Sequence, residues 1–516
     1  MSPTPFIHLS LSQLRILLLL TIVVSFYFNI HAIPLFDLDE GAFSEATREM
    51  LINGDFISTT LDGQPRYDKP ILIYWLQAVS VTLFGTNEFA FRLPSALAAT
   101  FWTLTIFLFL RRIRDEQTGL AAAIITASAF EVSVMASAAT ADALLNLFIT
   151  SSMLSIFLYW RERRQRWLLL SFALIGLGFL TKGPVAVLIP LMVSFLFFAI
   201  KRELGSWFRL VFNPAGIAIF LLIAAPWYVA QTLKEGDAFI QGFFFKHNIN
   251  RFQSPMEKHG GNLFYYIPIV LVAALPYTSL LVKSLARFRR FLQDDLSLFS
   301  LLWFGFVIIF FSLSGTKLPH YVLYGLSGLF LIMALNLSEL RSRFWLFLPA
   351  MLWFAFQLLL PEIMAEMLPR VEDPFAQEMI ADYQSHFSLA YRLFFLAAII
   401  FCLICMIDRK FHSSDKLLTT GLVSVLGLSL FLLPIVGEIK QGPIKEAAAI
   451  ANREGYSVVR WKLNTPSFSV YTRKVTASRR PEKGEIVLTK NKHLEGLPEY
   501  EVLYQRGGVV MARLIP

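Results

Sequence analysis

Carboxylates and cationic side chains gather between residues 36 and 75 of a chain that is otherwise largely apolar. A carboxylate held where a chain leaves the bilayer can take a proton from a hydroxyl group or hold a cation, and we expect this chemistry of Asp37, Asp39 and Glu40. Lys69 precedes a proline and an apolar, aromatic run, so its ammonium group would lie at the mouth of an apolar groove. That position suits a phosphate with a lipid tail. Its alternative role is that of an anchor lysine at the membrane interface.

The same stretch also has a structural interpretation as a capped helix at the membrane surface. Asp37 or Asp39 could cap a helix that begins in "DLDEG", and Glu40 would then lie in the first turn, where the helix dipole favours acids. Glu45 and Arg48 are three residues apart and would pair on the exposed surface of that helix. The acids to which we assign a solvated, structural role are Glu45, Glu49 and Asp55.

Cationic side chains recur in three later segments that lie between apolar runs. These segments are "GFLTKGPVAVLIP" with Lys182, "FFFKHNINRF" with Lys246, His247 and Arg251, and "FSLSGTKLPHYVLY" with Lys317, His320 and Tyr321. Several cations on one face favour phosphate as the ligand, because Lys and Arg form charge-assisted contacts with it. His247 and His320 could ligate a metal, but no HxxxH or comparable pair supports that role.

The elements that must position these groups are membrane helices. The chain has 516 residues, of which 56% are hydrophobic and 16% charged, and its mean hydropathy is +0.57. Apolar runs of about twenty residues are long enough to span a bilayer as helices. We predict about thirteen spans, centred near residues 22, 100, 127, 150, 173, 191, 220, 271, 304, 329, 352, 396 and 425. The run at 71–84 is either a further span or an interfacial helix, and the first run is expected to be a retained helix.

The distribution of Lys and Arg predicts the orientation. Short basic loops such as "RRIRDE" and "RERRQR" belong on the cytoplasmic side, and alternation then places the polar segments described above together on the opposite side. The net charge of +9 and the pI near 9.4 come mainly from such loops, so we expect no nucleic-acid partner. Cys402 and Cys405 lie inside an apolar run and are interpreted as packing residues.

The composition changes after residue 436. We therefore predict a transmembrane domain over residues 1–436, with an external loop at 34–88 that carries interfacial helices, and a small α/β domain over 437–516. In that tail, "PIKEAAAIANREG" has the pattern of an amphipathic helix that ends at Gly455. The stretches with period-two patterning typical of strands are "YSVVRWKL", "SFSVYTRK", "GEIVLTK", "YEVLYQRG" and "GVVMARLI".

Six motifs together resemble those of a known enzyme family. "DLDEGAFSEATREM", "RYDKPILIYWL", "FGTNEFAFRLPSAL", "TADALLNLF", "GFLTKGP" and "FSLSGTKLPHYVL" are similar, in the same order, to motifs of the ArnT-like and protein O-mannosyltransferase-related glycosyltransferases. These are GT-C class membrane enzymes, and the similarity is closest to bacterial members that use polyprenyl-phosphate sugars, including the lipid A aminoarabinose transferases. It extends over about residues 30–330.

The resemblance implies a sugar donor linked to a polyprenyl phosphate and transfer on the periplasmic face of a bacterial inner membrane. It implies a lipid A-type glycolipid, a polysaccharide or a protein as acceptor, and membrane lipid as surroundings. Asp39 and Asp142 match the two acidic catalytic positions, and a divalent cation held by them is left open. The residues that match the donor-phosphate elements are Tyr67, Lys69, Lys182, His247, Arg251, Lys317 and Tyr321. The residues expected to support them are Asp37, Glu40, Asp68 and His320. Phe43 stands where a Tyr is common, and Asp68 where a Glu is common.

Two other functions compete with this interpretation. A lipid-linked substrate transporter or flippase would use the same groove without chemistry, but such proteins tend to show internal repeats and polar residues near the membrane centre. The two halves of this chain do not match, and Glu131 is the one acid near a span to which we assign no role. A non-catalytic scaffold would not need the pattern of acids and bases. No GxGxxG or GxxxxGK loop for a nucleotide occurs.

Overall fold

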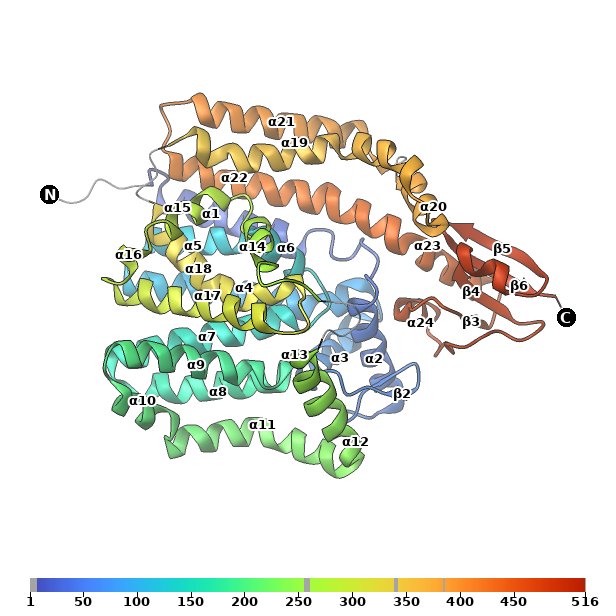
Figure 1. Ribbon diagram of the computed structural model, residues 1–516, viewed down its shortest axis with the longest axis horizontal. Coiled ribbons are helices and arrows are strands. Elements are labelled where there is room, and N and C mark those ends of the chain that lie inside the picture. Colours follow the sequence, from blue (N-terminus) through green and yellow to red (C-terminus); the bar gives the residue numbers. More distant parts are fainter. Residues whose placement is uncertain (1–6, 255–259, 338–341, 384–385, 516) are drawn as a thin grey trace.

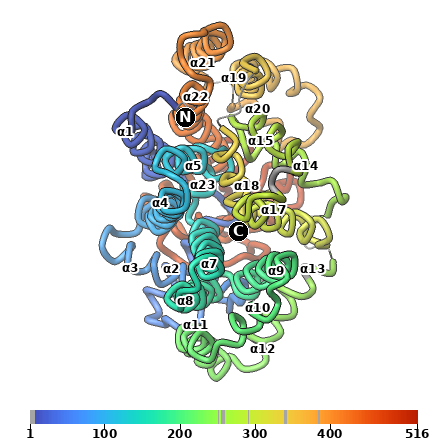
Figure 2. Tube along the Cα trace, turned by 90° about the vertical axis from the view of Figure 1, so that its left-hand side faces the viewer, coloured from blue at the N-terminus to red at the C-terminus, as the bar shows by residue number. Residues whose placement is uncertain are grey.

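Long helices run side by side along the molecule, and a small sheet closes one end (Figure 1). The computed structural model describes residues 7–254, 260–337, 342–383 and 386–515. Seen along the helices, α8 lies between α7 and α11 (Figure 2). The fold is therefore that of an α-helical polytopic membrane protein with a small C-terminal α/β domain, as predicted.

The elements follow one another as a nearly continuous series of helices. Up to residue 200 they are α1 (Leu11–Ile22), η1 (Val23–Tyr27), α2 (Asp39–Asn53), β1 (Thr60–Leu61), β2 (Gln64–Pro65), α3 (Leu72–Phe84), α4 (Glu88–Ile113), α5 (Glu116–Ser128), α6 (Phe130–Ala136), α7 (Asp142–Glu162), α8 (Gln165–Lys182) and α9 (Val185–Ile200). They continue as α10 (Leu204–Val211), α11 (Pro214–Glu235), α12 (Asp237–Phe239), η2 (Ile240–Asn250), α13 (Arg251–Gln253), α14 (Tyr266–Ala273), α15 (Thr278–Leu285), α16 (Phe288–Phe291), α17 (Asp295–Leu313), η3 (Pro319–Val322) and α18 (Leu323–Leu335). The last third holds α19 (Phe344–Met367), η5 (Leu368–Arg370), α20 (Pro374–Tyr383), α21 (Leu389–Ile407), α22 (Ser413–Gly427), η7 (Leu428–Leu432), α23 (Leu433–Arg453), β3 (Val458–Arg460), α24 (Pro466–Thr472), β4 (Ile486–Lys490), η8 (Asn491–Gly496), β5 (Tyr500–Arg506) and β6 (Val509–Leu514).

Each of the predicted span centres falls inside a helix, but the helices differ in length. Within the described residues, seven helices are long and apolar enough to cross a membrane, or eight if the bent pair α5–α6 is one span. The other centres lie in α1, α8, α9, α14 and α18. Length and hydropathy thus support fewer spans than the thirteen predicted. The ambiguous run at 71–84 forms α3, whose 13 residues are too few to span a bilayer alone.

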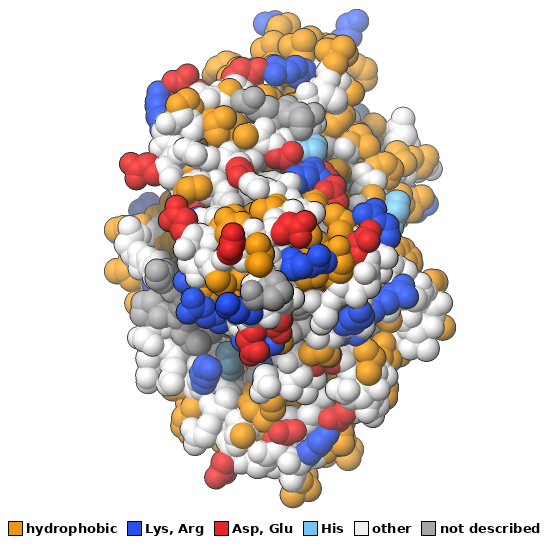
Figure 3. Space-filling view, turned by 90° about the vertical axis from the view of Figure 1, so that its right-hand side faces the viewer, with side chains coloured by type: hydrophobic (Ala, Val, Ile, Leu, Met, Phe, Trp, Pro, Cys, Tyr) orange, Lys and Arg blue, Asp and Glu red, His pale blue; other side chains and the backbone are white. Residues whose placement is uncertain are grey.

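Charged groups mark the two ends of the helices differently. At the end away from the sheet, the basic loops are joined by ion pairs such as Arg112–Glu162 and Arg114–Asp294. The opposite end carries α2, α3 and the C-terminal sheet (Figure 1). Lys, Arg, Asp and Glu side chains are mixed across that end (Figure 3). The polar segments singled out in the sequence lie there, away from the basic loops.

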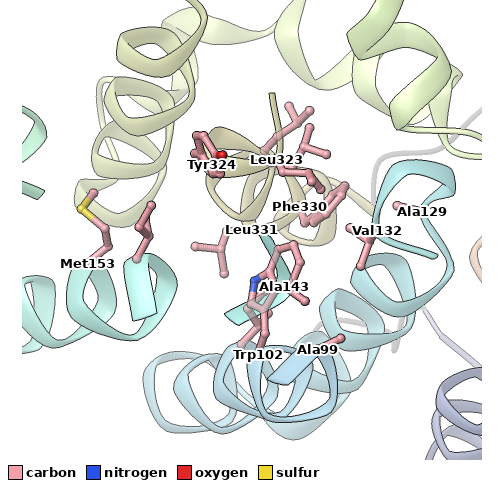
Figure 4. Close-up of a cluster of buried hydrophobic side chains, with 14 of the residues drawn as sticks. Ala99, Trp102, Ala129, Val132, Ala143, Met153, Leu323, Tyr324, Phe330 and Leu331 are labelled. Atoms are coloured by element: carbon pink, nitrogen blue, oxygen red, sulfur yellow. The ribbon is translucent and has the colours of Figure 1, made fainter. Parts of the chain in front are cut away.

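Buried polar contacts fix the helices that lie behind these segments. Trp102 of α4 packs beside Leu331 of α18 (Figure 4), and its indole N–H donates to Ser327 Oγ at 2.7 Å. Ser327 also lies 2.7 Å from the Thr150 hydroxyl of α7. These contacts tie α4, α7 and α18 together, and they set Tyr324, one helical turn before Ser327, at a fixed position.

The C-terminal domain follows the last membrane helix without an intervening loop. The predicted boundary at residue 436 falls inside α23, which runs without a break from the bundle to the sheet. The sheet has the order β3-β4-β6-β5, in which β3 and β4 are parallel and the other pairs antiparallel. Cys402 and Cys405 are free and buried in α21, as expected for packing residues.

One predicted strand of this domain is wrong. The stretch "SFSVYTRK" forms helix α24, which has Pro466 in its first turn and packs between α2 and α23. Proline is well suited to a helix start. Nearly all of the helix is buried, so its alternating small and large residues do not mark two faces of a strand. Tertiary packing therefore overrides the period-two pattern.

Helix α2 is also unlike the solvated, capped helix expected. Its N-cap is Leu38, with no side-chain cap, and Asp39 begins the helix itself. Glu45 and Arg48 do pair, at 2.6 Å, but they are buried rather than exposed, and Glu49 is buried too. The local sequence does not predict the burial of these side chains, because α24, which lies more than 400 residues away in the chain, covers α2.

Candidate active site

Charged, aromatic and aliphatic side chains surround a cavity of about 470 Å³. Asp68, Lys69, Lys182 and His247 line it together with a wall of aromatic and aliphatic residues. The apolar members of this wall are Pro184, Val185, Leu188, Phe243, Phe244, Ile249, Phe252, Phe310 and Phe311. A cavity with charged groups and a long apolar wall fits a ligand that has a charged head and a hydrocarbon tail.

Asp142, Lys182 and Tyr324 form a buried triad in the cavity wall. Lys182 Nζ donates to Asp142 Oδ1 at 2.6 Å and to the Tyr324 hydroxyl at 2.7 Å, and that hydroxyl donates to Asp142 Oδ1 at 3.0 Å. Gly183 follows Lys182 with a φ of +76°, a conformation that glycine adopts readily, and a Cβ there would lie 2.6 Å from the Phe243 ring. The end of α8 can therefore turn tightly, with Phe243 packed against it.

Asp68 is the centre of a second ionic group. Its carboxylate lies 2.9 Å from Lys69 Nζ, 3.2 Å from Arg66 and 3.1 Å from His247 Nδ1. Although burial alone would raise it, the neighbouring charges of Lys69, His247 and Arg66 hold the pKa of Asp68 well below its ordinary value. Asp68 thus stays ionised and holds the cations at the cavity.

Tyr67 connects the external loop to the end of α11. Its hydroxyl donates to Glu235 Oε2 at 2.7 Å. Burial, together with the hydrogen bond and negative charge of Glu235, raises the pKa of Tyr67 to about 12. Tyr67 therefore keeps its proton and acts as a donor.

A second cavity, of about 190 Å³, lies beside Asp37, Asp39 and Glu40. Asp39 is exposed, and it makes no hydrogen bond or ion pair with any other residue that the structure describes. Glu40 is instead buried, pairs with Arg92 at 2.7 Å and accepts the backbone N–H of Ala139 at 2.6 Å. Asp39 thus has the geometry of a proton acceptor, whereas Glu40 holds α2 against α4 and the turn before α7.

The two cavities are linked through the turn at residues 140–142. Thr140 lines the second cavity, and its hydroxyl donates to Asp142 Oδ2 at 3.2 Å. Asp142 in turn holds Lys182, which lines the first cavity. A group bound in either cavity would therefore lie close to the same turn.

The remaining predicted residues lie around the first cavity with different contacts. Tyr321 lines it and packs against Tyr324 at 6.1 Å between ring centroids. Lys317 is buried and donates to the Ser314 carbonyl at 2.6 Å, so it points along its own loop. His320 acts on Asp142 electrostatically. Arg251 begins α13, and its side chain lies outside the described residues.

Asp39 and Asp142, which the sequence offers as candidate metal ligands, belong to no group of three or more close ligand side chains among the described residues. The one group there of three or more His, Cys, Asp or Glu side chains close enough to share an ion is Glu45, Glu49 and Asp62. Glu45 pairs with Arg48 and Asp62 with Arg460, so this group already has cationic partners. The cations Lys69 and Lys182 supply the positive charge at the first cavity.

The sequence analysis missed Tyr324 and Arg92, and it assigned no role in the site to Arg66, a cation of the acidic loop. Tyr324 is one helical turn from Tyr321, and this spacing was the available signal, since it places both rings on one face. Arg66 stands next to Tyr67 and pairs with Asp68. Arg92 lies in an apolar helix, where a buried charge requires a partner, and that partner is Glu40.

Asp37 joins the site loop to the C-terminal domain and gives a pH-dependent prediction. It accepts the backbone N–H and the hydroxyl of Ser467 at 3.0 and 2.5 Å. Burial raises the pKa of Asp37 to about 7 although Ser467 and Arg460 lower it. The neutral form is favoured in the folded state, so the contribution of Asp37 to stability is present below about pH 4 and is lost as the pH rises through about 7.

We therefore expect Asp37→Asn to raise the melting temperature at pH 8 and to change it little at pH 4, since an amide cannot ionise. The loss in the wild type corresponds to about 4 kcal/mol at most. Thermal unfolding of the detergent-solubilised protein at both pH values measures this. An equal shift at both pH values, or a loss of stability at pH 8, would contradict the burial of an ionisable Asp37.

Known proteins resemble the chain in both sequence and fold. The family model described as dolichyl-phosphate-mannose-protein mannosyltransferase matches residues 68–229. An undecaprenyl phosphate-alpha-4-amino-4-deoxy-L-arabinose arabinosyl transferase of Erwinia tasmaniensis is 32% identical over 310 residues, which cover 58% of this chain and 55% of the relative. The enzyme of the same name from Serratia proteamaculans is 30% identical and covers 62% and 60%. The chain thus spans little more than half the length of these curated relatives.

The solved structures add the architecture. The crystal structure of ArnT from Cupriavidus metallidurans bound to undecaprenyl phosphate superposes with a TM-score of 0.82 over 98% of both chains, at 18% identity. The chain is therefore similar to these arabinosyl transferases in sequence and to ArnT in fold. With its apolar helices, it is an integral, multi-pass membrane protein. The family model covers Asp68 and Lys69 and the ion pair of Asp142 and Lys182, whereas His247 lies beyond the matched residues.

Proposed function

We propose that this ArnT-like protein is a glycosyltransferase that moves a sugar from a polyprenyl-phosphate donor to an acceptor of the cell envelope, with a lipid A-type glycolipid as the leading candidate. The observation that carries the proposal is the first cavity, which combines Lys69, Lys182 and His247 with a long apolar wall. The relatives named as arabinosyl transferases, and the ArnT crystal structure with undecaprenyl phosphate, support this class of donor.

The residues divide the reaction between the two cavities. Lys69 and Lys182 lie where they can neutralise the phosphate that leaves the sugar, and the aromatic wall receives the polyprenyl chain. Tyr67 and Asp68 hold the loop and its cations in place. Asp39, which has no hydrogen-bond or ion-pair partner among the described residues, lies beside the second cavity and takes the proton of the acceptor. Binding both substrates next to the turn at 140–142 makes the transfer effectively unimolecular.

We further propose that the reaction takes place on the periplasmic side of a bacterial inner membrane. The basic loops gather at one end of the helices, and Lys- and Arg-rich short loops stay in the cytoplasm. Asp39, Lys69 and the C-terminal domain lie at the other end, which is then periplasmic. Labelling of single cysteines placed beside Asp39 and in the 161–166 loop, with a reagent that cannot cross the membrane, tests this orientation.

Replacing Lys69 with alanine should lower kcat/KM for the donor about 10- to 100-fold, the loss expected for one hydrogen bond to a charged group. The assay uses purified protein in proteoliposomes with undecaprenyl-phosphate 4-amino-4-deoxy-L-arabinose and a panel of other undecaprenyl-phosphate sugars. Envelope lipids and proteins serve as acceptors, and mass spectrometry detects the added sugar.

Lys234→Ala is the matched control, because Lys234 pairs with Asp55 near the same external loop but lines neither cavity. It should keep the activity of the wild type. Failure of the wild type to transfer any sugar of the panel would overturn the proposed function, and full activity of Lys69→Ala would overturn the role of that cation.

A further inference from the structure

A third cavity, of about 540 Å³, lies at the end of the helices away from the sheet. Five of its eight described lining residues are charged. The lining residues are Arg114, Phe157, Trp160, Arg161, Arg163, Asp294, Asp295 and Leu296. They belong to the last turns of α7, the residue after α4 and the start of α17. Helices α7, α9 and α17 pack together at this end (Figure 2). None of the lining residues belongs to the first or the second cavity.

Aromatic and cationic side chains indicate that this cavity opens at the membrane surface. Trp160 lines it, and Trp167 and Trp207 lie in the neighbouring helices α8 and α10. Lys201 Nζ lies 5.6 Å from the centre of the Trp160 ring, and the Arg166 guanidinium lies 4.7 Å from that of Trp167. Tryptophan is enriched at the level of the lipid headgroups. A phospholipid headgroup is therefore the ligand class closest to the cavity.

The charges of the cavity are only weakly committed to one another. Three ion pairs lie in or beside its wall, and they are Arg114–Asp294, Arg163–Glu203 and Lys201–Asp295. Every side chain in them is at least 27% exposed. Such exposed pairs contribute little free energy, so a ligand can replace one of the partners at small cost. Arg161 is exposed and forms no hydrogen bond or ion pair within the described part of the chain.

The cavity thus offers cations and carboxylates to one ligand. We propose that it binds the headgroup of a phospholipid that carries both a phosphate and a primary ammonium group, as phosphatidylethanolamine does. The phosphate lies against Arg161 and Arg163, and the ammonium group donates to Asp295. Phe157 and Leu296 provide apolar contacts beside the headgroup. The site is separate from the proposed glycosyltransferase site, so either proposal can fail without the other.

Two other common headgroups fit the same wall less well. Phosphatidylglycerol carries a net negative charge and no ammonium group, so it leaves Asp294 and Asp295 facing an anion. Phosphatidylcholine has a cationic nitrogen without N–H groups and cannot donate to a carboxylate. A surface that merely attracts anionic lipid would instead prefer phosphatidylglycerol. The order of preference therefore distinguishes a built headgroup site from a basic surface.

Competition among these lipids tests the proposal. The full-length protein is placed in nanodiscs that contain equal amounts of the three lipids with identical acyl chains, and native mass spectrometry identifies the lipids that stay bound. We expect phosphatidylethanolamine to be retained about three- to tenfold more than either of the others, the effect of one charge-assisted contact at a partly exposed site. Equal retention of all three, or a preference for phosphatidylglycerol, would overturn the proposal. Displacement of the lipid by glycerophosphoethanolamine at the same concentration would overturn a lipid as the ligand.

Arg161→Ala tests the phosphate contact. The variant should fold normally, because no described residue loses a hydrogen bond or an ion pair. It should retain about three- to tenfold less phosphatidylethanolamine than the wild type. Arg166→Ala is the matched control, since Arg166 lies in the same basic loop but does not line the cavity. Unchanged retention in Arg161→Ala, or an equal loss in the control, would remove the phosphate from this position.

Asp295→Asn tests the ammonium contact through the choice of lipid. The variant removes a carboxylate from the cavity and leaves Lys201 without its acidic partner. The retention ratio of phosphatidylethanolamine to phosphatidylglycerol should therefore fall to about one or below, because the wall becomes more positive. Arg161→Ala should lower the retention of both lipids instead. An unchanged ratio in Asp295→Asn would contradict recognition of the ammonium group and overturn the assignment of a zwitterionic ligand.

Discussion

Replacing Asp39 with asparagine should lower kcat for sugar transfer by about 10²- to 10⁴-fold, the usual contribution of a general base. The reason is the isolation of this carboxylate. It lies in the first turn of α2 beside the second cavity, and no other described residue forms a hydrogen bond or ion pair with it. An amide of the same shape keeps the contacts of the side chain but cannot accept the proton of the acceptor.

The same isolation predicts what Asp39→Asn leaves unchanged. Because no described residue loses a hydrogen bond or an ion pair, the melting temperature and the binding of undecaprenyl phosphate should stay close to those of the wild type. Asp55→Asn is the control, since Asp55 lies after the far end of α2 and pairs with Lys234. Steady-state kinetics measures the expected loss of kcat, and thermal unfolding measures whether the melting temperature stays unchanged. Retention of kcat within about tenfold would show that Asp39 is not the base.

The helical part of the fold is predictable from the sequence because hydrophobic length is a local property. Every predicted span centre lies in a helix, since an apolar run in lipid has to satisfy its own backbone hydrogen bonds. The number of spans is less predictable. Helices such as α9 and α14 are short, and tertiary packing rather than length decides how far each one reaches.

Residues of the site are predictable where their charge is costly in an apolar chain. Asp68, Lys69, Lys182 and His247 stand out for that reason, and the structure brings all four to one cavity. Tyr324 does not stand out, because a tyrosine in an apolar helix is common until Asp142 and Lys182 are seen to meet its hydroxyl.

The burial of the charged pair on α2 cannot be predicted from the neighbouring sequence. The spacing of Glu45 and Arg48 correctly predicts a pair, yet it cannot show that the C-terminal domain buries it. Arg48 also donates to the Arg473 carbonyl, 425 residues further along the chain. Whether a charged pair faces water or protein depends on such long-range contacts.

Replacing Lys182 with methionine should abolish transfer and destabilise the protein by about 3–5 kcal/mol, the cost of leaving one member of a buried ion pair without its partner. The pair is short, 2.6 Å between Lys182 Nζ and Asp142 Oδ1, and both side chains are largely buried. Without the ammonium group, the Asp142 carboxylate would retain the hydroxyls of Tyr324 and Thr140 and the electrostatic influence of His320, but no ion pair with Lys182. Chemical denaturation in detergent measures the loss of stability.

The double variant Lys182→Met with Asp142→Asn separates the structural role of the lysine from its chemical role. It removes both charges, so most of the lost stability should return, because an uncharged pair no longer requires compensation. Sugar transfer should stay absent, since the leaving phosphate still lacks Lys182, one of its two lysine cations in the first cavity. A double variant as unstable as the single one would contradict the buried pair, and recovery of transfer along with stability would show that Lys182 supports the fold without acting on the phosphate.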